Sequence, residues 1–394
     1  PTIDLGWEPQ WVLIKRATGG TANWMLFDSM RGISSYNDCV LYPNTSDGDN
    51  CSNDWIKVTS RGFKVDKSDP PVNEGGNEYV YVAIRRPDGL VGKPPEAGNE
   101  VFDLTYGSTD SATPQFRTST VDVSDFTFYK QPASAGADWY AGARLIRERY
   151  LFINTNGAIS NDSNEKYDYM NGFGSWTSNG TSYLSYIWKR HAGFDVQTYT
   201  GVSGTATRPH SMGVTPEMIW VKRRNYAERW CVGHHGLNAG TTPWIYYMRI
   251  EATPEYLNNQ FYQPPTSTHW STNSGGLTNN NGDQYIAMLF ASIDGISKVG
   301  YYPGDGTTSH VITTGFTPRL LIIKVLEDSN NWFVYDSARG LGSGADPTLQ
   351  LDTNNAQFGA SDDNFDVSAT GFTIKVSGNH INGSGKNYIY YAHA

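Results

Sequence analysis

Aromatic residues in long polar loops are the side chains of this sequence best suited to recognise a ligand. They lie among Gly, Asn, Ser and Thr, have no counterpart in the other repeats of the chain, and are Trp176, Tyr262, His269 and Trp270. Aromatic faces stack on sugar rings, and loops on a rigid β scaffold commonly carry recognition residues. The pattern predicts a ligand-binding surface at these four residues. The alternative is that a loop aromatic covers the core or packs on a neighbouring subunit.

Catalytic motifs are not found. Glycan hydrolysis needs two facing carboxylates about 5 to 10 Å apart, and nothing in the sequence pairs Glu165, Glu251 or Glu255. The sequence contains no G-x-S-x-G elbow and no P-loop. We therefore expect that the protein is not an enzyme and that it uses no cofactor.

Metal binding is not expected either. The 8 histidines form no H-E-x-x-H motif. Adjacent His234 and His235 would point to opposite faces of a strand. The acidic loop Asp47-Gly48-Asp49-Asn50 departs from the twelve-residue calcium pattern, so a solvated turn is the expectation and calcium the alternative.

The 3 cysteines are Cys39, Cys51 and Cys231. An odd and sparse set is no disulfide framework, and the absence of a C-x-x-C pair argues against structural zinc. Cys39 and Cys51 share one loop region and could pair. Free and partly buried thiols are the expectation.

Composition excludes several classes of partner. The net charge is -9, and Lys and Arg are scattered, whereas phosphate binding needs a basic surface. No apolar run approaches 18 residues, so we expect no membrane insertion. The 41 glycines, 25 tyrosines and 12 tryptophans are typical of an all-β protein with polar turns and aromatic-bearing strands.

The predicted ligand-binding loops must be positioned by a scaffold, and a short strand motif that recurs along the chain indicates what that scaffold is. Gly6–Arg16 returns as Gly213–Arg223 and Gly315–Lys324, each with a Gly-x-x-Pro turn, an apolar run and a lysine. Such recurrence predicts copies of one unit. The units are expected at residues 1–100, 101–192, 193–293 and 294–394, with the second divergent. We predict tandem antiparallel β-sandwich repeats, jelly-roll-like, with about six to eight strands each and no long helix.

The first unit lacks a connector hairpin apart from Pro1–Leu5. This suggests a missing upstream segment, and removal of an initiator methionine is the alternative explanation for Pro1.

Three kinds of residue recur between the units, and we give each a structural role. Tryptophans are expected to anchor the core of their own unit rather than to form a stacking platform, and lysines to be solvated strand ends or ion-pair partners rather than anion sites. An Asp-x-x-Arg spacing predicts a local charge pair that shapes a turn. The residues are Trp24, Trp139, Trp230 and Trp332; Lys15, Lys130, Lys222 and Lys324; and Asp28 with Arg31 and Asp336 with Arg339.

The recurring signature resembles an uncharacterised repeat domain of virion proteins in tailed bacteriophages, notably marine and cyanobacterial phages. The residues that carry the resemblance are Gly6–Arg16 with Trp24–Gly32, Gly213–Arg223 with Trp230, and Gly315–Lys324 with Trp332–Gly340. It covers most of the chain and is weakest in 101–192. The resemblance implies structural or tail-associated adhesive proteins, and it brings no catalytic residues.

From this resemblance we expect a phage virion structural protein, a tail fibre or other appendage that engages the host surface by multivalent binding. Its partners would be other virion proteins, further copies of itself (a trimer, by analogy with appendages) and a glycan or protein of the host surface. It would be assembled in the host cytoplasm and carried in the virion. A capsid decoration or neck protein without a host ligand is one alternative, and a surface polysaccharide depolymerase is another.

Overall fold

The computed structural model describes residues 1–33, 38–59, 61–85, 95, 97–108, 113–175, 180–250, 256–257 and 259–394. Within these residues the chain is all-β, as the sequence predicts. Every strand pair in the described part of the chain is antiparallel, and the helices found there are four short 3-10 turns. None of the described helices is long and apolar enough to cross a membrane.

We number the four expected residue ranges units 1 to 4, and each holds eight strands among the described residues. Unit 1 contains β1 (Thr2–Asp4), β2 (Pro9–Arg16), β3 (Met25–Asp28), β4 (Asp38–Val40), β5 (Asn50–Asn53), β6 (Ile56–Thr59), β7 (Gly62–Val65), β8 (Tyr79–Arg85) and η1 (Gly98–Glu100). Unit 2 contains β9 (Phe102–Tyr106), β10 (Phe116–Arg117), β11 (Phe126–Lys130), β12 (Tyr140–Ala143), β13 (Arg149–Phe152), β14 (Ser160–Asn161), β15 (Gly172–Phe173), η2 (Gly180–Ser182) and β16 (Leu184–Trp188).

The second half of the chain repeats this content. Unit 3 contains β17 (Phe194–Thr200), β18 (Ala206–Pro209), β19 (Met218–Arg223), β20 (Cys231–His234), η3 (Leu237–Gly240), η4 (Pro243–Ile245), β21 (Tyr246–Arg249), β22 (Tyr256–Leu257), β23 (His269–Thr272) and β24 (Gln284–Phe290). Unit 4 contains β25 (Ser297–Pro303), β26 (His310–Thr313), β27 (Leu320–Val325), β28 (Phe333–Asp336), β29 (Leu349–Gln350), β30 (Phe365–Ser368), β31 (Gly371–Ile374) and β32 (Asn387–His393).

Units 2, 3 and 4 share one sheet topology. In each main sheet the last strand of the unit lies between its first and third strands, in the orders β9-β16-β11, β17-β24-β19 and β25-β32-β27. A smaller sheet packs on one face and closes a sandwich; in unit 4 this sheet is β26-β31-β30. The glycines that precede the recurring strand, Gly6, Gly213 and Gly315, have φ values of 77°, 75° and 89°, a region that favours glycine.

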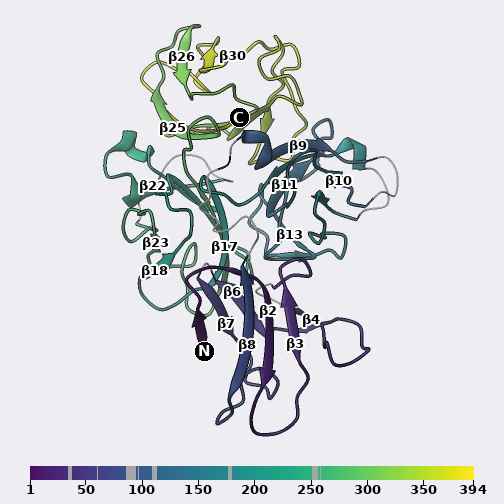
Figure 1. Ribbon diagram of the computed structural model, residues 1–394. Helices are drawn as coiled ribbons and strands as arrows, with labels where there is room; N and C mark the ends of the chain where they lie inside the picture. Colours follow the sequence, from purple (N-terminus) through teal and green to yellow (C-terminus); the bar gives the residue numbers. More distant parts are fainter. Residues whose placement is uncertain are drawn as a thin grey trace.

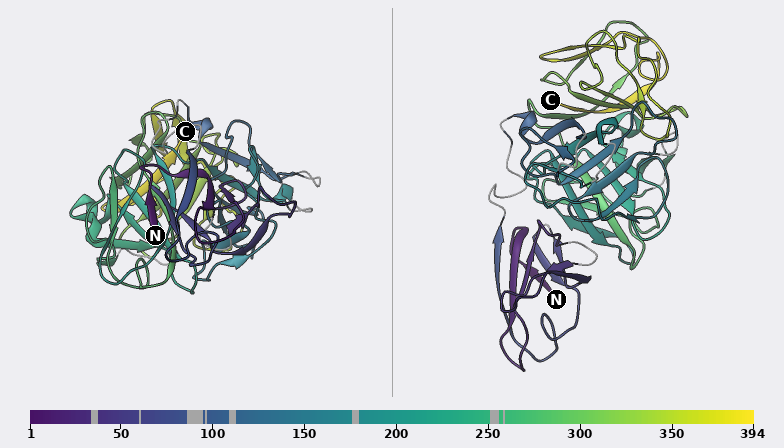
Figure 2. Two further views of the ribbon diagram at one scale, coloured as in Figure 1. Left: turned by 60° about the horizontal axis from the view of Figure 1, so that its bottom comes forward. Right: turned by 90° about the vertical axis from the view of Figure 1, so that its right-hand side faces the viewer.

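Unit 1 differs at one edge. Its main sheet has the order β3-β2-β8, so β8 is an edge strand among the described residues, whereas β16, β24 and β32 are central strands. Its sandwich has its own core, which includes Val12, Ile14 and Phe63. Units 2, 3 and 4 lie together, and unit 1 lies at one end of the molecule (Figures 1 and 2).

A common core joins units 2, 3 and 4. On β27, Leu321 and Ile323 point into the sandwich of unit 4, while Leu320 and Ile322 point into a cluster shared by all three units. We call this cluster, which extends from Phe102 to Tyr391, the common core. Both faces of the central strands are therefore buried, which explains their continuous apolar runs.

The recurring tryptophans join one unit to the next. Trp139 donates its indole N–H to the carbonyl oxygen of Gln350 at 2.8 Å. The indole of Trp230 donates to the carbonyl of Phe152 at 2.8 Å, and that of Trp332 donates to the carbonyl of Arg249 at 3.1 Å. The bonds run from unit 2 to 4, from 4 to 3 and from 3 to 2, which closes a cycle.

These contacts correct one expectation. Trp139, Trp230 and Trp332 are buried as predicted, but they anchor the common core rather than the core of a single unit. Trp24 is 38% exposed, so the prediction that it is a core residue was wrong. Sequence periodicity shows that a strand has two apolar faces, but it does not say which neighbour covers each face.

The recurring lysines also differ from their prediction. Lys130, Lys222 and Lys324 are fully buried rather than solvated, because the adjacent unit covers the strand face on which they lie. Each ammonium group donates instead to carbonyl oxygens of the following turn, as in the 3.1 Å bond from Lys324 to Asp328. Burial lowers the pKa of Lys324 to about 8. The two predicted local charge pairs are confirmed, with N–O distances of 2.5 Å for Asp28–Arg31 and 2.6 Å for Asp336–Arg339.

Candidate functional site

Trp270 does not face a ligand in this structure. It lies on β23, is 1% exposed and belongs to the core of unit 3. Its ring meets Tyr199 edge to face at a centroid distance of 5.5 Å, and its Nε1 donates to Gln197 Oε1 at 3.0 Å. The alternative role, in which the aromatic residue completes the core, therefore describes Trp270. The other predicted tryptophan, Trp176, lies outside the described residues.

Tyr262 and His269 remain on the surface, on the two arms of one hairpin. Tyr262 is 45% exposed, and His269 is also exposed because the strand alternation that turns Trp270 inward turns His269 outward. The amide of Thr266 donates to the carbonyl of His269 at 2.8 Å, and the hydroxyl of Thr268 lies 2.8 Å from His269 Nδ1. The hairpin thus presents one phenol ring, one imidazole and several hydroxyl groups to the solvent.

A cavity of about 550 Å³ lies between units 1 and 2, and the sequence alone did not reveal it. Its walls come from the ends of β2 and β3 in unit 1 and from the loops next to β11, β12, β15 and β16 in unit 2. The lining residues that carry its chemistry are Glu8, Trp11, Asp28, Met30, Arg31, Asp122, Asp125, Arg144, Met170 and Arg190.

Arg190 lies at the centre of the charges around this cavity. Its guanidinium pairs with Asp195 at 2.6 Å and with Glu8 of unit 1, and its backbone N–H donates to Asp125 at 2.8 Å. Burial opposes its charge, but Asp195 and Glu8 together raise the pKa of Arg190 above its ordinary value. Arg190 therefore stays protonated and ties unit 1 to unit 2.

The other lining carboxylates also have cationic partners. Asp28 pairs with Arg31 at 2.5 Å, and Asp122 pairs with Lys189 at 2.8 Å. A wall of paired charges, combined with the apolar groups of Trp11, Met30 and Met170, suits a neutral polar ligand such as a sugar.

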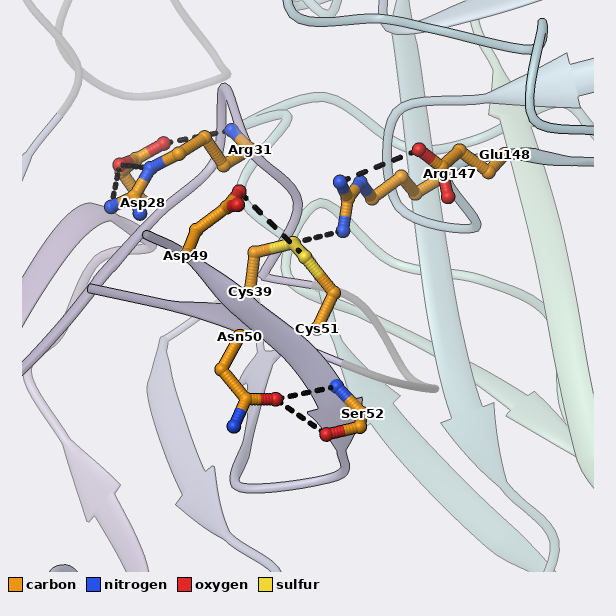
Figure 3. Close-up of a disulfide and its surroundings, with 9 residues drawn as sticks. All are labelled: Asp28, Arg31, Cys39, Asp49, Asn50, Cys51, Ser52, Arg147 and Glu148. Carbon is orange, nitrogen blue, oxygen red and sulfur yellow. Dashed lines mark hydrogen bonds and ion pairs between the residues drawn. A yellow bond between two sulfur atoms is a disulfide. The ribbon is translucent and has the colours of Figure 1, made fainter. Parts of the chain in front are cut away.

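The disulfide between Cys39 and Cys51 corrects the expectation of free thiols (Figure 3). Strands β4 and β5 pair with each other, and this brings the two Cα atoms to 4.0 Å. Asp49 lies beside the two sulfur atoms, and the ligand atoms of the three residues lie within 4.8 Å of one another. Because both sulfur atoms are consumed in the disulfide, they are not thiolate ligands for a metal.

Arg147 of unit 2 reaches across to this disulfide. Its guanidinium contacts Cys39 Sγ and also pairs with Glu148 at 3.5 Å, as Figure 3 shows. The acidic loop nearby has exposed Asp47 and Asp49 side chains. The disulfide therefore stands at the junction of units 1 and 2.

A buried carboxyl group in unit 2 has a strongly perturbed pKa. Glu165 is fully buried and accepts a hydrogen bond from the hydroxyl of Tyr129. Burial raises the pKa of Glu165 to about 8. No sequence signal marked this group, because its environment comes from strands that are distant in the chain. It has no access to solvent, so it affects folding rather than ligand chemistry.

The fold and these surfaces define an all-β repeat protein in which several units share one core. The chain matches a family described as Domain of unknown function (DUF7483) over residues 1–86 and 174–394, and it belongs to that family. The unmatched stretch 87–173 contains most of the divergent unit 2. No curated protein matches the chain.

Proposed function

We propose that this chain is a structural protein of a phage virion, a tail fibre or other appendage that engages the host surface through several weak contacts at once. The observation that supports this best is the common core, because one continuous hydrophobic cluster joins units 2, 3 and 4. Contacts made by loops on one rigid body share an effective concentration, so avidity exceeds the affinity of each contact. The sequence resemblance to phage virion proteins supports the same proposal.

The proposed ligand is a glycan of the host surface. Tyr262 and His269 offer exposed rings, and the hydroxyl groups of Thr266 and Thr268 form hydrogen bonds with His269. The cavity between units 1 and 2 is lined by apolar side chains, among them Trp11, Met30 and Met170, and by paired charges such as Arg190 with Glu8. Both surfaces suit neutral sugars, which stack on rings and exchange hydrogen bonds with polar side chains.

Binding of the purified chain to host cells and to a glycan array tests the proposal. Tyr262→Ala and His269→Ala should each weaken binding by about tenfold, which corresponds to about 1.4 kcal/mol. Tyr226→Ala is the matched control, because Tyr226 is 58% exposed on the same unit but outside the hairpin. Unchanged binding in both hairpin variants would remove this site from the proposal.

The location of the chain in the intact particle separates the proposal from its alternatives. Immunogold labelling should place the chain on tails or other appendages. Label on heads, together with no binding to cells, would identify a decoration protein. Release of reducing sugar from host polysaccharide by the purified chain would identify a depolymerase.

A further inference from the structure

The same sheet face is buried in units 2, 3 and 4, and we call it the shared face. In unit 4 it consists of outward residues on the central strand β32 and their neighbours on β27. Ile389 pairs with Lys324, Tyr391 with Ile322, and His393 with Leu320. Ile389 and Tyr391 are each 1% exposed and His393 is 0% exposed, because the other two units cover them.

Unit 1 carries the equivalent face in the same register. Val80 pairs with Lys15 as Ile389 pairs with Lys324, and Val82 pairs with Leu13 as Tyr391 pairs with Ile322. Lys15 donates to the carbonyl of Ala22 at 2.6 Å, which repeats the lysine-to-turn bond of the other units. Strands β2 and β8 of unit 1 are therefore paired in the register of β27 and β32 of unit 4, although β8 is an edge strand among the described residues.

The difference lies in what covers this face. Val80, Val82 and Ile84 are 55%, 54% and 49% exposed. Trp24 is 38% exposed, whereas its equivalent Trp332 is 2% exposed. The apolar side chains of this face are thus buried in units 2, 3 and 4 but exposed together in unit 1. Contiguous apolar patches of this kind mark sites of protein association.

The backbone amide of Trp24 donates to a side-chain oxygen, as the amides of the equivalent Trp139 and Trp332 do. The amide of Trp24 donates to Asn44 Oδ1 at 2.8 Å, as the amide of Trp139 donates to Asn154 Oδ1 at 2.8 Å. In units 2 and 4 the carbonyl that accepts an indole bond belongs to Phe152 or Gln350, two residues before the residue that accepts the tryptophan amide, Asn154 or Asp352. The corresponding residue of unit 1 is Tyr42.

We infer that unit 1 buries its shared face against unit 1 of two further copies of this chain, in a threefold ring that repeats the arrangement of units 2, 3 and 4. In this ring Trp24 donates its indole N–H to the backbone carbonyl of Tyr42 in the next copy. Units 2, 3 and 4 indicate that further copies of unit 1 cover this face. Their three like faces already close a cycle, in which each tryptophan indole donates to the next unit. A head-to-tail contact that closes after three units gives a ring rather than an open filament.

The mass of the chain in solution tests the ring. Light scattering after gel filtration should give three times the 43.6 kDa chain mass. Val82→Asp places a charge in the buried face and should give a monomer. Val311→Asp is the matched control, because Val311 is 65% exposed on β26 of unit 4, away from this face, and this variant should stay trimeric. A wild-type chain that is monomeric or dimeric at about 100 μM, where a micromolar interface is occupied, would overturn the inference.

A photo-reactive phenylalanine analogue at position 24 tests the direction of the contact in a folded chain. Cross-linked dimers and trimers should form, with the attachment in the peptide that contains Tyr42 of another copy. The same analogue at position 311 should give no such products. Attachment of position 24 to position 24, or capture of a strand from a different protein along β8, would overturn the ring.

Discussion

Trp332→Phe should destabilise units 2, 3 and 4 together, although the residue belongs to unit 4 alone. Phenylalanine keeps one ring in the common core but removes the indole N–H that bonds to the carbonyl of Arg249 at 3.1 Å. Trp332 is 2% exposed, so water cannot replace the lost donor. The variant therefore tests whether the bond between units contributes to folding.

The expected loss has two parts. A hydrogen bond contributes about 1 kcal/mol net. The missing part of the indole removes apolar contacts equivalent to about two buried methylene groups, or about 1.6 kcal/mol. Together they predict a decrease of roughly 2 to 3 kcal/mol in the free energy of unfolding.

Urea unfolding combined with hydrogen exchange measures this loss. The urea midpoint of the larger transition should fall, and peptides of units 2 and 3 should lose protection together with those of unit 4, since all three share one core. Unit 1 has a separate core and should keep its midpoint. Trp24→Phe, made in the Val82→Asp background where unit 1 stays unassembled, is the control and should cost less than about 0.5 kcal/mol.

Loss of protection confined to unit 4 would refute the reasoning. It would mean that the units fold independently and that the bonds between them form without contributing to stability. A loss of unfolding free energy in Trp332→Phe that is smaller than the loss in the Trp24→Phe control would refute it as well.

Three further predictions concern single groups. Replacing Cys39 and Cys51 with serine should lower the stability of unit 1 by about 3 kcal/mol, seen as a shift of its urea midpoint while units 2, 3 and 4 are unchanged. Burial raises the pKa of Glu165 from 4.5 to about 8, so its contribution to stability is complete below pH 4.5 and is lost as the pH rises through about 8. The wild type should lose roughly 5 kcal/mol over that range relative to Glu165→Gln, measured by denaturant unfolding at each pH, and parallel pH profiles would contradict this assignment. Asp336→Ala leaves the buried guanidinium group of Arg339 without its carboxylate and should lower the free energy of unfolding by about 3 to 5 kcal/mol. The loss for Asp28→Ala should be smaller, because the Asp28 side chain is 18% exposed. Equal losses of the two variants in denaturant unfolding would count against burial as the cause.

Much of the fold could be predicted from the sequence because its signals are local. The strand period, the glycine turns and the Asp-x-x-Arg charge pairs depend on residues that are close in the chain, and the structure confirms the all-β class and both charge pairs. Recurrence of the Gly-x-x-Pro strand indicated like units. In the described residues each sheet draws its strands from one of the expected ranges.

The candidate site depended on contacts that no local pattern contains. Trp270 and His269 are neighbours in sequence, yet the pairing of β23 turns one ring into the core and the other into the solvent. The disulfide needed the pairing of β4 with β5, and the cavity needed unit 1 against unit 2.

The sequence by itself determined the strands, the turns and the recurrence of one unit. Only the tertiary structure decided which face of each strand meets another unit. Trp139 and its acceptor Gln350 are 211 residues apart, and Trp24 has the same sequence context but remains exposed. An apolar residue is drawn to any surface that excludes water, and the sequence does not say which surface that is.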